Sequence, residues 1–152
     1  MYFAKVHALL KPGGLFLNHC ITHDVEGCEK TPSSEFIKRY VFSDGQLDTV
    51  SNIQRVMGRA HFEIDDVESL RPHYALTLGH WVMRLEPHHA QALQYVNEST
   101  WRVWRLYMAA CALEFESGEI GVRQILASTR AGRATALPLT RRQQYPITGL
   151  PG

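Results

Sequence analysis

Side chains that can bind metals or transfer protons are concentrated in one short segment, GGLFLNHCITHD, which carries His19, Cys20, His23 and Asp24. Cys20, His23 and the later Cys28 have the spacings C-x2-H and H-x4-C, and His19 could supply a fourth metal ligand. Structural zinc sites usually pair two such short motifs across a longer gap, and no second pair follows here. The spacing therefore favours a strand end that turns into a polar loop, and we expect no bound metal.

A looser candidate pair consists of His19, which follows a predicted strand, and Tyr74 in RPHYALTLGHW. Open α/β sheets bind their ligands at the carboxyl ends of parallel strands, where we expect His19 to lie. Spacing alone leaves open whether His19 is functional or only solvated. The adjacent His88 and His89 point about 100° apart at a helix start and cannot easily share one ligand. Gly-rich phosphate loops, G-x-S-x-G and C-x-x-C motifs are absent from the sequence.

The elements that must position these residues alternate between helix and strand. Apolar residues at helical spacing predict a helix over 2–10, which Pro12 and two glycines end, and LFLNHCI then predicts a strand over 15–21. A helix, a Pro-Gly turn and a strand form the second half of a βαβ unit, whose first strand would precede Met1. TVSNIQRVMGRAHF predicts a helix, and 62–70 a strand with Phe62, Ile64 and Val67 facing inward.

The most distinct predicted element is a long helix that begins near Glu98. Asn97 can cap it, and a run of large or apolar residues falls at alternating steps of three and four: Trp101, Trp104, Met108, Cys111 and Phe115. This pattern favours core packing over a cofactor-binding stripe. A strand over 120–127 follows, and the tail from Thr129 has no periodicity.

Composition describes one ordinary globular domain. The 152 residues are 45% hydrophobic and 20% charged, and 16 Lys and Arg against 15 Asp and Glu give a net charge of +1. Such a balance provides no long-range attraction for nucleic acid, so we expect no nucleic-acid partner. Three cysteines without disulfide-like spacing, together with the lack of a signal peptide or a run of about 18 apolar residues, predict a cytoplasmic protein.

Five phrases carry more specific information: LLKPGGLFLNHCI, FIKRYVFSDGQL, LRPHYALTLGHW, WRVWRLYMAACALEFESGEIGVRQILAS and LPLTRRQQYP. In this order they resemble the C-terminal half of the cyclopropane-fatty-acyl-phospholipid synthase family, which includes the mycolic acid cyclopropane synthases. The resemblance implies an α/β fold, the C-terminal part of a class I (Rossmann-like) methyltransferase sheet. Strands five to seven would be 15–21, 62–70 and 120–127, with flanking and inserted helices. Residues 1–128 would belong to this domain and 129–152 to an irregular tail.

The resemblance also implies a reaction and two site residues. Family members transfer a methylene from S-adenosylmethionine to a cis double bond of an unsaturated acyl chain, and a bound bicarbonate, held by a Glu, a Cys, a His and a Tyr, acts as base. FLNHCI matches the family's strand phrase LLH-T-I, which assigns the His to His19. The phrase Y-x-x-T-L-x-x-W matches Tyr74, Thr77, Leu78 and Trp81 and assigns the Tyr to Tyr74. An imidazole and a phenol can donate hydrogen bonds to a small anion.

Other parts of the family pattern are missing from this sequence. They are the Gly-rich turn after the first strand, the acidic residue that holds the cofactor ribose, and the E-H-V/I phrase. We therefore expect the chain alone to bind no S-adenosylmethionine and to be inactive, with the Glu and Cys of the anion site supplied from elsewhere and not by Cys20 or Cys28. Two alternatives stay open: a methyltransferase for a small amine or other acceptor, and a non-catalytic remnant that pairs with a complementary N-terminal half or a second copy.

The resemblance finally gives a role to the aromatic residues. In the family, the inserted and C-terminal helices help to enclose the acyl chain, so candidates for its wall are Tyr40, Phe42, Trp81, Trp101, Trp104 and Tyr107. Phospholipid substrates imply transient contact with the inner face of the membrane. In the family's strand order one edge of the strand over 15–21 would have no partner in this chain, and such an edge promotes aggregation.

Overall fold

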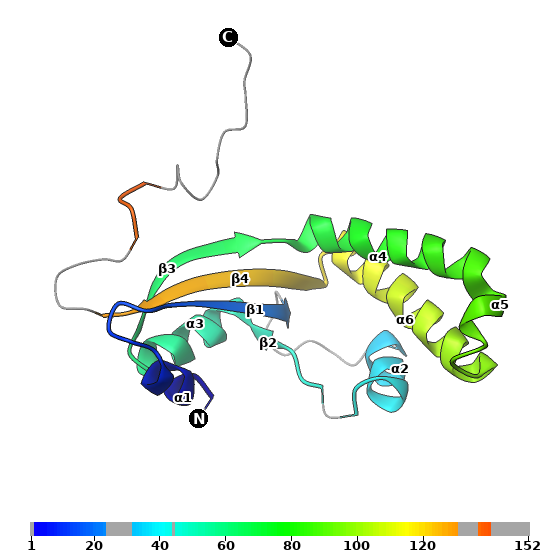
Figure 1. Ribbon diagram of the computed structural model, residues 1–152, viewed down its shortest axis with the longest axis horizontal. Coiled ribbons are helices and arrows are strands. Elements are labelled where there is room, and N and C mark those ends of the chain that lie inside the picture. Colours follow the sequence, from blue (N-terminus) through cyan, green and yellow to red (C-terminus); the bar gives the residue numbers. More distant parts are fainter. Residues whose placement is uncertain (1, 24–31, 44, 131–136, 141–152) are drawn as a thin grey trace, which may run out of the picture.

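The computed structural model describes residues 2–23, 32–43, 45–130 and 137–140. It contains one mixed sheet with the strand order β2-β1-β4-β3 (Figure 1). The strands are β1 (Leu15–His23), β2 (Asp48–Thr49), β3 (Phe62–Ser69) and β4 (Ile120–Thr129). β4 runs antiparallel to both β1 and β3, whereas β2 is parallel to β1. The carboxyl ends of β1 and β3 therefore lie at the same edge of the sheet.

β4 lies between β1 and β3, and apart from Arg123 and Gln124 its residues are apolar or small on both faces. Ile125 and Ala127 are fully buried on one face, and Val122 is fully buried on the other. A strand covered on both sides shows a nearly continuous apolar run instead of strict alternation. Each face of β4 is thus the base of a separate hydrophobic core.

The first core lies between the sheet and two helices, α1 (Tyr2–Leu9) and α3 (Val50–Arg59). Ile53 and Met57, one helical turn apart on α3, pack with Phe62 at the start of β3. The side chain of Thr49 caps α3 by accepting a hydrogen bond from the Asn52 backbone nitrogen at 3.2 Å.

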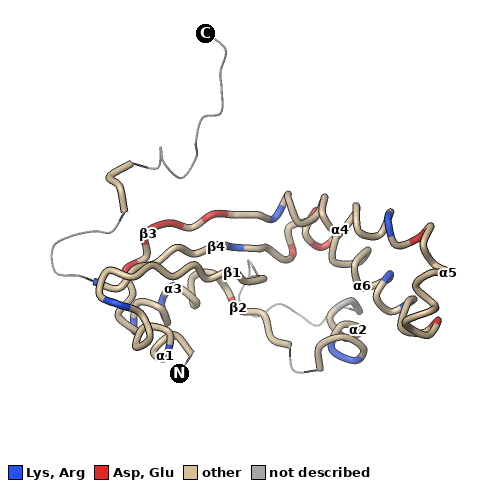
Figure 2. Tube along the Cα trace, in the orientation of Figure 1, with Lys and Arg blue, Asp and Glu red and all other residues tan. Residues whose placement is uncertain are grey.

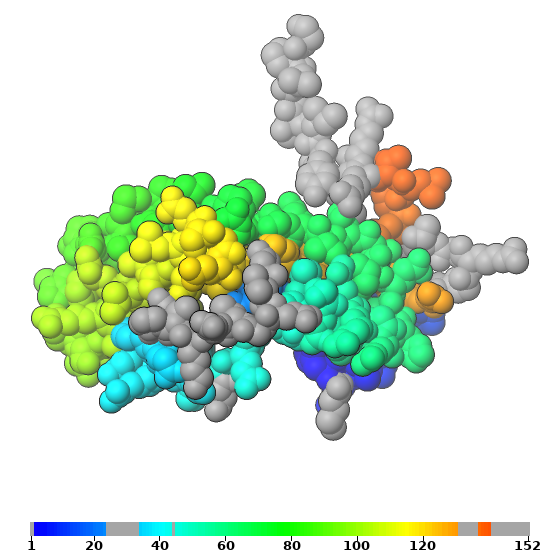
Figure 3. Space-filling model, turned by 180° about the vertical axis from the view of Figure 1, so that it is seen from behind, coloured from blue at the N-terminus to red at the C-terminus, as the bar shows by residue number. Residues whose placement is uncertain are grey.

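The second core lies under two long helices that pack side by side and extend beyond the sheet, α4 (Arg71–Leu85) and α6 (Glu98–Ser117) (Figure 1). The 3-10 helix η1 (Glu86–His88) and α5 (His89–Ala92) join them, and α2 (Pro32–Tyr40) contacts α6. The buried members of this core are Leu78, Cys111, Phe115, Ile120 and Val122. Seen from behind, α2 and α6 form one side of the molecule and α1 and α3 the other (Figure 3).

Asn97 caps the start of α6 as the sequence predicts, and a glycine ends the helix. Asn97 Oδ1 accepts a hydrogen bond from the Thr100 backbone nitrogen at 2.8 Å, and Gly118 ends the helix with a left-handed φ of 89°. Arg71 Nη1 adds a second connection at the C-terminus, since it donates to the carbonyl oxygen of Phe115 at 2.7 Å. The start of α4 therefore caps the end of α6.

The apolar stripe of α6 enters the core only in part. Cys111 and Phe115 are buried, but Trp101 is half-buried and 45% of Trp104 is exposed. The reason is the length of the helix, because only its C-terminal half reaches the sheet (Figure 1). The prediction of core packing is correct for that half and wrong for Trp104.

β1 is longer than the sequence predicts. Thr22 and His23 continue the ladder opposite Gly121 and Ile120 of β4. His19 is therefore the fifth residue of a nine-residue strand. Its predicted place at the carboxyl end of the strand is wrong.

A register shift between Ile64 and Asp66 changes the face of the following residues on β3. Asp65 is the extra residue of this bulge. A bulge of one residue moves every later side chain to the other face of the sheet, so Val67, the register partner of Ile125, lies on the same face as Phe62 and Ile64, as predicted. Val67 is nevertheless 36% exposed and does not join the first core, whereas Phe62 is buried as expected.

The two edges of the sheet differ in charge. Acidic residues follow one another along β3, as Figure 2 shows, and charged side chains protect an edge strand against pairing with another chain. On the outer edge of β1, only Thr22 and His23 pair with β2 among the described residues, and residues 15–21 carry no Asp, Glu, Lys or Arg. Within the described ranges, no helix is long and apolar enough to cross a membrane.

Candidate functional site

His19 on β1 and Tyr74 on α4 form the most specific polar contact between the sheet and the helices. The Nε2 atom of His19 lies 2.9 Å from the hydroxyl oxygen of Tyr74, and the two ring centroids are 5.7 Å apart. The residues are 55 positions apart in the sequence. The fold therefore brings together the two residues that the sequence singled out.

Tyr74 is held in place by the junction between β3 and α4. The backbone nitrogen of Leu70 donates to the Val122 carbonyl at 2.9 Å, which ties the start of α4 to the central strand. The Tyr74 backbone nitrogen then donates to the Leu70 carbonyl at 3.0 Å. Its ring packs beside Phe115, with 5.6 Å between centroids, at the border of the second core. Only its hydroxyl end reaches the sheet surface beside His19.

His19 projects from the face of β1 that carries Leu17 and Ile21, because side chains two residues apart lie on the same face. Leu17 is 51% and Ile21 38% exposed, so the imidazole has apolar neighbours on both sides. Gln124 is its partner across the ladder, and the Gln124 side-chain nitrogen lies 3.2 Å from His19 Nδ1. Sequence reasoning missed Gln124, since only the pairing of β1 with β4 reveals it.

Cys20 does not belong to this site. It points to the opposite face of β1 and packs against the first core, where Asn18 Nδ2 donates to its sulfur at 3.3 Å. Burial raises the pKa of the Cys20 thiol. Asp24 and Cys28 lie outside the described residues, and the parts that are described contain no group of three potential metal ligands.

Three of the predicted wall residues form one aromatic cluster. The ring of Phe42 lies 6.0 Å from that of Tyr107, which in turn lies 5.5 Å from the ring of Trp104 and perpendicular to it. Tyr107 also donates a hydrogen bond to the Cys111 sulfur. Desolvation raises the pKa of Tyr107 to about 12 and that of Cys111 to about 11. Trp81, on α4, is not in this cluster and is 48% exposed.

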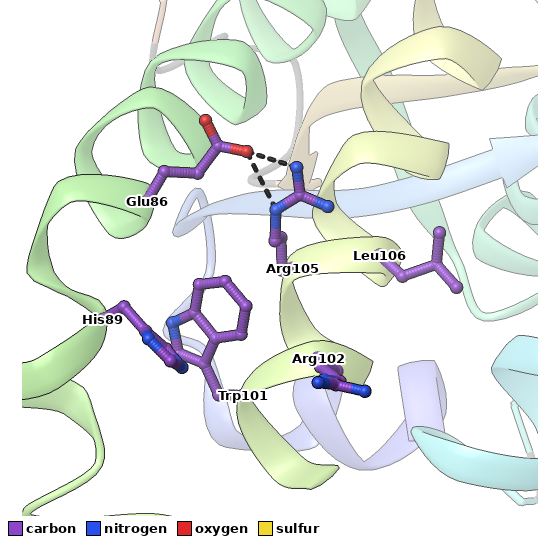
Figure 4. Close-up of a pocket in the computed structure, with 6 residues that line it drawn as sticks. All are labelled: Glu86, His89, Trp101, Arg102, Arg105 and Leu106. Carbon is purple, nitrogen blue, oxygen red and sulfur yellow. Dashed lines mark hydrogen bonds and ion pairs between the residues drawn. The ribbon is translucent and has the colours of Figure 1, made fainter. Parts of the chain in front are cut away.

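The other two predicted wall residues border hollows along α6. A groove of about 650 Å³ between α2 and α6 is lined by Phe36, Tyr40, Glu98, Ser99, Arg102, Val103 and Leu106. A second hollow of about 600 Å³ is lined by Glu86, His89, Trp101, Arg102, Arg105 and Leu106 (Figure 4). In it, Arg105 Nε donates to Glu86 Oε1 at 2.8 Å, and the rings of His89 and Trp101 are 4.4 Å apart. His19 and Tyr74 line neither hollow.

The geometry of His19 and Tyr74 fits a small hydrogen-bond acceptor. A neutral imidazole has one N–H and a phenol one O–H, and both groups lie at the surface of the sheet. The neighbouring side chains on this face of β1 are apolar and exposed, so the two polar groups lie beside a surface that suits hydrocarbon. Such an arrangement can hold an anion next to an apolar substrate.

Comparison with known proteins shows the family of the chain. Residues 1–125 match the protein family described as "Mycolic acid cyclopropane synthetase". The chain belongs to this family. Among curated members, a "Probable fatty acid methyltransferase" of Pseudomonas putida is 44% identical over 148 residues, which are 95% of this chain and 38% of that protein. Another, from Mycobacterium tuberculosis, is 38% identical over 128 residues, 84% of this chain and 30% of its own length.

Solved structures of the mycolic acid cyclopropane synthetase family have the same architecture. The cyclopropane synthase MmaA2 from Mycobacterium tuberculosis matches with a TM-score of 0.79 and 29% identity, over 84% of this chain and 48% of that one. The chain thus spans less than half the length of these relatives. A phosphoethanolamine N-methyltransferase from Haemonchus contortus, at 15% identity and a TM-score of 0.72, shows the fold alone. The sheet is therefore part of the class I S-adenosylmethionine-dependent methyltransferase fold.

The mycolic acid cyclopropane synthase CmaA1 was solved in complex with SAH and CTAB, and the Haemonchus contortus enzyme in complex with S-adenosyl-L-methionine. In this chain, the His19–Tyr74 pair can donate a hydrogen bond to a small anion.

Proposed function

We propose that the chain supplies the His–Tyr half of an anion site in an enzyme that transfers a methylene group from S-adenosylmethionine to the cis double bond of an unsaturated acyl chain. The observation that carries this proposal is the 2.9 Å contact between His19 Nε2 and the Tyr74 hydroxyl. Family membership supports the reaction class, and the alignment of two separate phrases onto two residues in contact supports the site.

The reaction explains why such a site is useful. An alkene is a weak nucleophile, and after it accepts the methyl group the resulting carbocation must lose a proton for the ring to close. Bicarbonate bound at the site supplies the base for that proton. The Tyr74 hydroxyl would orient it by donating a hydrogen bond to one of its oxygens, and His19 would hold that hydroxyl in place.

Apolar residues around the site support an acyl substrate over a small amine. Leu15, Leu17 and Ile21 line the same face of β1 as His19, and each is at least 38% exposed. The relatives support the same choice, because they include probable fatty acid methyltransferases and a mycolic acid cyclopropane synthase solved in complex with SAH and CTAB.

The end of α2 suits contact with a lipid surface. Tyr40 and Phe42 are 54% and 51% exposed, and the cationic side chains of Lys38 and Arg39 precede them. Basic and aromatic residues together favour the interface of an anionic bilayer. We infer that substrate is reached at such a surface. Flotation with vesicles that contain anionic phospholipid should capture the chain, and Lys38→Glu/Arg39→Glu should reduce this capture at low salt; equal capture of both proteins would contradict it.

A chimera tests the proposed reaction directly. In the chimera, this chain would replace the matching 38% of the Pseudomonas putida relative, and the remaining 62% would come from that relative. With S-adenosylmethionine, bicarbonate and vesicles of unsaturated phospholipid, the chimera should form acyl products one carbon heavier, detected by mass spectrometry. His19→Ala and Tyr74→Phe should lower the rate by about 10²-fold or more and change S-adenosylmethionine affinity little.

Two matched variants serve as controls. His88→Ala and Tyr95→Phe make the same chemical changes at exposed positions and should leave the rate unchanged. A chimera that binds S-adenosylmethionine but methylates a small amine instead of lipid would refute the acyl substrate. Rates of Tyr74→Phe and His19→Ala equal to those of the controls would refute the anion site.

A further inference from the structure

We propose that Gln124 is a positioning residue: it keeps the proton of neutral His19 on Nε2 and thereby makes the Tyr74 hydroxyl a hydrogen-bond donor to the ligand. The role of Gln124 follows from its place on β4. It is paired with His19 across the antiparallel ladder, so its side chain lies on the same face of the sheet. Its side-chain nitrogen is 3.2 Å from His19 Nδ1.

In the structure the amide nitrogen of Gln124, and not its oxygen, faces Nδ1 of His19. A primary amide nitrogen has two hydrogens and no acceptor lone pair, so it can only donate. Nδ1 of His19 must therefore accept, which requires it to carry no proton. In a neutral imidazole the single proton is then on Nε2.

The same direction continues to Tyr74. The Nε2–H of His19 points to an oxygen 2.9 Å away and donates to it, so the Tyr74 hydroxyl is the acceptor in this contact. Its own hydrogen stays available for another group. Three side chains thus form a series, Gln124 to His19 to Tyr74, in which each donor strengthens the next. The series ends in an O–H that can donate to a bound anion.

The identity of residue 124 determines this direction. A glutamate there would have the same shape but would accept from Nδ1–H, and Nε2 would then accept the hydrogen of Tyr74. The site would present lone pairs instead of a donor. An anion needs the donor, so an amide suits this position and a carboxylate does not. Binding of bicarbonate by the Tyr74 hydroxyl rests on the proposed function. The tautomer of His19 is independent of the proposed function.

The backbone around Gln124 is well placed to hold this geometry. β4 is hydrogen-bonded on both sides, to β1 and to β3, and the adjacent Ile125 is fully buried. On β3, Glu68 is the register partner of Gln124. An amide on a central strand has few alternative positions, whereas one on a loop would lose the contact through motion.

The experiment determines the tautomer in the chain itself. Protein labelled with 15N at histidine is studied by long-range 1H–15N correlation at a pH where an ordinary imidazole is neutral, and the His19→Ala spectrum identifies the His19 signals. We expect the proton on Nε2 in the unmodified chain and on Nδ1 in Gln124→Glu. In Gln124→Leu we expect a mixture of the two neutral tautomers. Gln91→Glu adds the same charge on exposed α5 and should leave the tautomer unchanged.

Bicarbonate binding provides the second readout, measured on the same proteins by 13C NMR titration. Gln124→Glu should weaken binding by about tenfold, the effect of one lost hydrogen bond, and Gln124→Leu by less. A proton on Nδ1 in the unmodified chain, or the same tautomer in Gln124→Glu, would overturn the proposal. If the tautomers shift as expected and no protein binds bicarbonate, the positioning role is supported and the bicarbonate site of the proposed function is refuted.

Discussion

The imidazole of His19 and the hydroxyl of Tyr74 meet at the point where the sheet borders the second core, 2.9 Å apart. One residue comes from the exposed face of a strand and the other from the first turns of a helix anchored to the central strand. Because the Tyr74 ring packs against Phe115, its position does not depend on the contact with His19. The hydroxyl is thus held for a partner by packing that lies outside the site.

This separation predicts that Tyr74→Phe changes function without changing the fold. The phenylalanine ring keeps the contact with Phe115, and only one partly exposed hydrogen bond is lost, so the free energy of unfolding should fall by at most about 1 kcal/mol. Tyr74→Ala removes the ring as well and should cost about 2–4 kcal/mol. Urea unfolding followed by circular dichroism measures both. Equal losses in the two variants would show that the hydroxyl, and not the ring, anchors α4.

Gly118 should be intolerant of a side chain. Its φ of 89° is left-handed, so Gly118→Ala should lower the free energy of unfolding by about 1–2 kcal/mol. Gly79, inside α4, is the matched control because an added Cβ would meet nothing within 4 Å. Gly79→Ala should raise stability by about 0.5–1 kcal/mol. Thermal unfolding of the two variants should therefore shift in opposite directions, and shifts of the same sign would contradict the assignment of the cap.

Stability should fall in alkaline solution because of Cys111 and Tyr107. Their pKa values are raised from 9.0 to about 11 and from 10.0 to about 12, so the folded state keeps both protons at a pH where the unfolded chain loses them. The unfolded state then binds fewer protons, and the free energy of unfolding should be constant below pH 9 and decline above it. The loss should be on the order of 3–4 kcal/mol by pH 11. Denaturant unfolding under reducing conditions at pH 8 to 11 measures it.

Cys111→Ala separates the two groups. It removes the thiol that titrates first, so the decline should begin about one pH unit higher, where tyrosine ionises in the unfolded chain. A decline in this variant that matches that of the unmodified chain between pH 9 and 10 would contradict the role given to Cys111.

The uncharged outer edge of β1 predicts self-association of the isolated chain. Leu17→Lys places a cation on this strand and should shift sedimentation at high protein concentration toward the monomer, since charged side chains on an edge strand oppose pairing with another chain. Leu76→Lys is the control, because Leu76 is 68% exposed and lies on α4 instead of the edge strand. Equal effects of the two substitutions would indicate association through general hydrophobic contacts.

The sequence predicted elements best where local signals agree. For α6 the cap at Asn97, the apolar spacing and Gly118 all indicate the same helix, and the structure confirms it. β2 has only two residues, Asp48 and Thr49, and so has no periodicity to detect. The sequence predicted Val67 on the face of Phe62 and Ile64, where the bulge at Asp65 places it, but it could not predict the 36% exposure of this side chain.

The site was predicted only in part, and from a resemblance to a family instead of from local signals. His19 and Tyr74 were identified because whole phrases resemble a family, and their contact could not have been derived from spacing across 55 positions. Gln124 lies between Arg123 and Ile125 in a strand whose other residues predict burial, and no local sequence signal indicates a functional role for it. Strand register is a property of the folded sheet, and it is the register that joins Gln124 to the site.

The central position of β4 has a consequence for synthesis of the chain on the ribosome. His19 and Gln124 are 105 positions apart. Beyond the β1–β4 ladder, the Gly13 backbone nitrogen donates a further hydrogen bond to the Thr129 carbonyl oxygen at 3.0 Å. At roughly 5–20 residues per second, β1 leaves the ribosome roughly 5–20 s before the strand that must lie beside it. During this interval its apolar edge is open, so a nascent chain of this sequence should depend on chaperones until its last strand emerges.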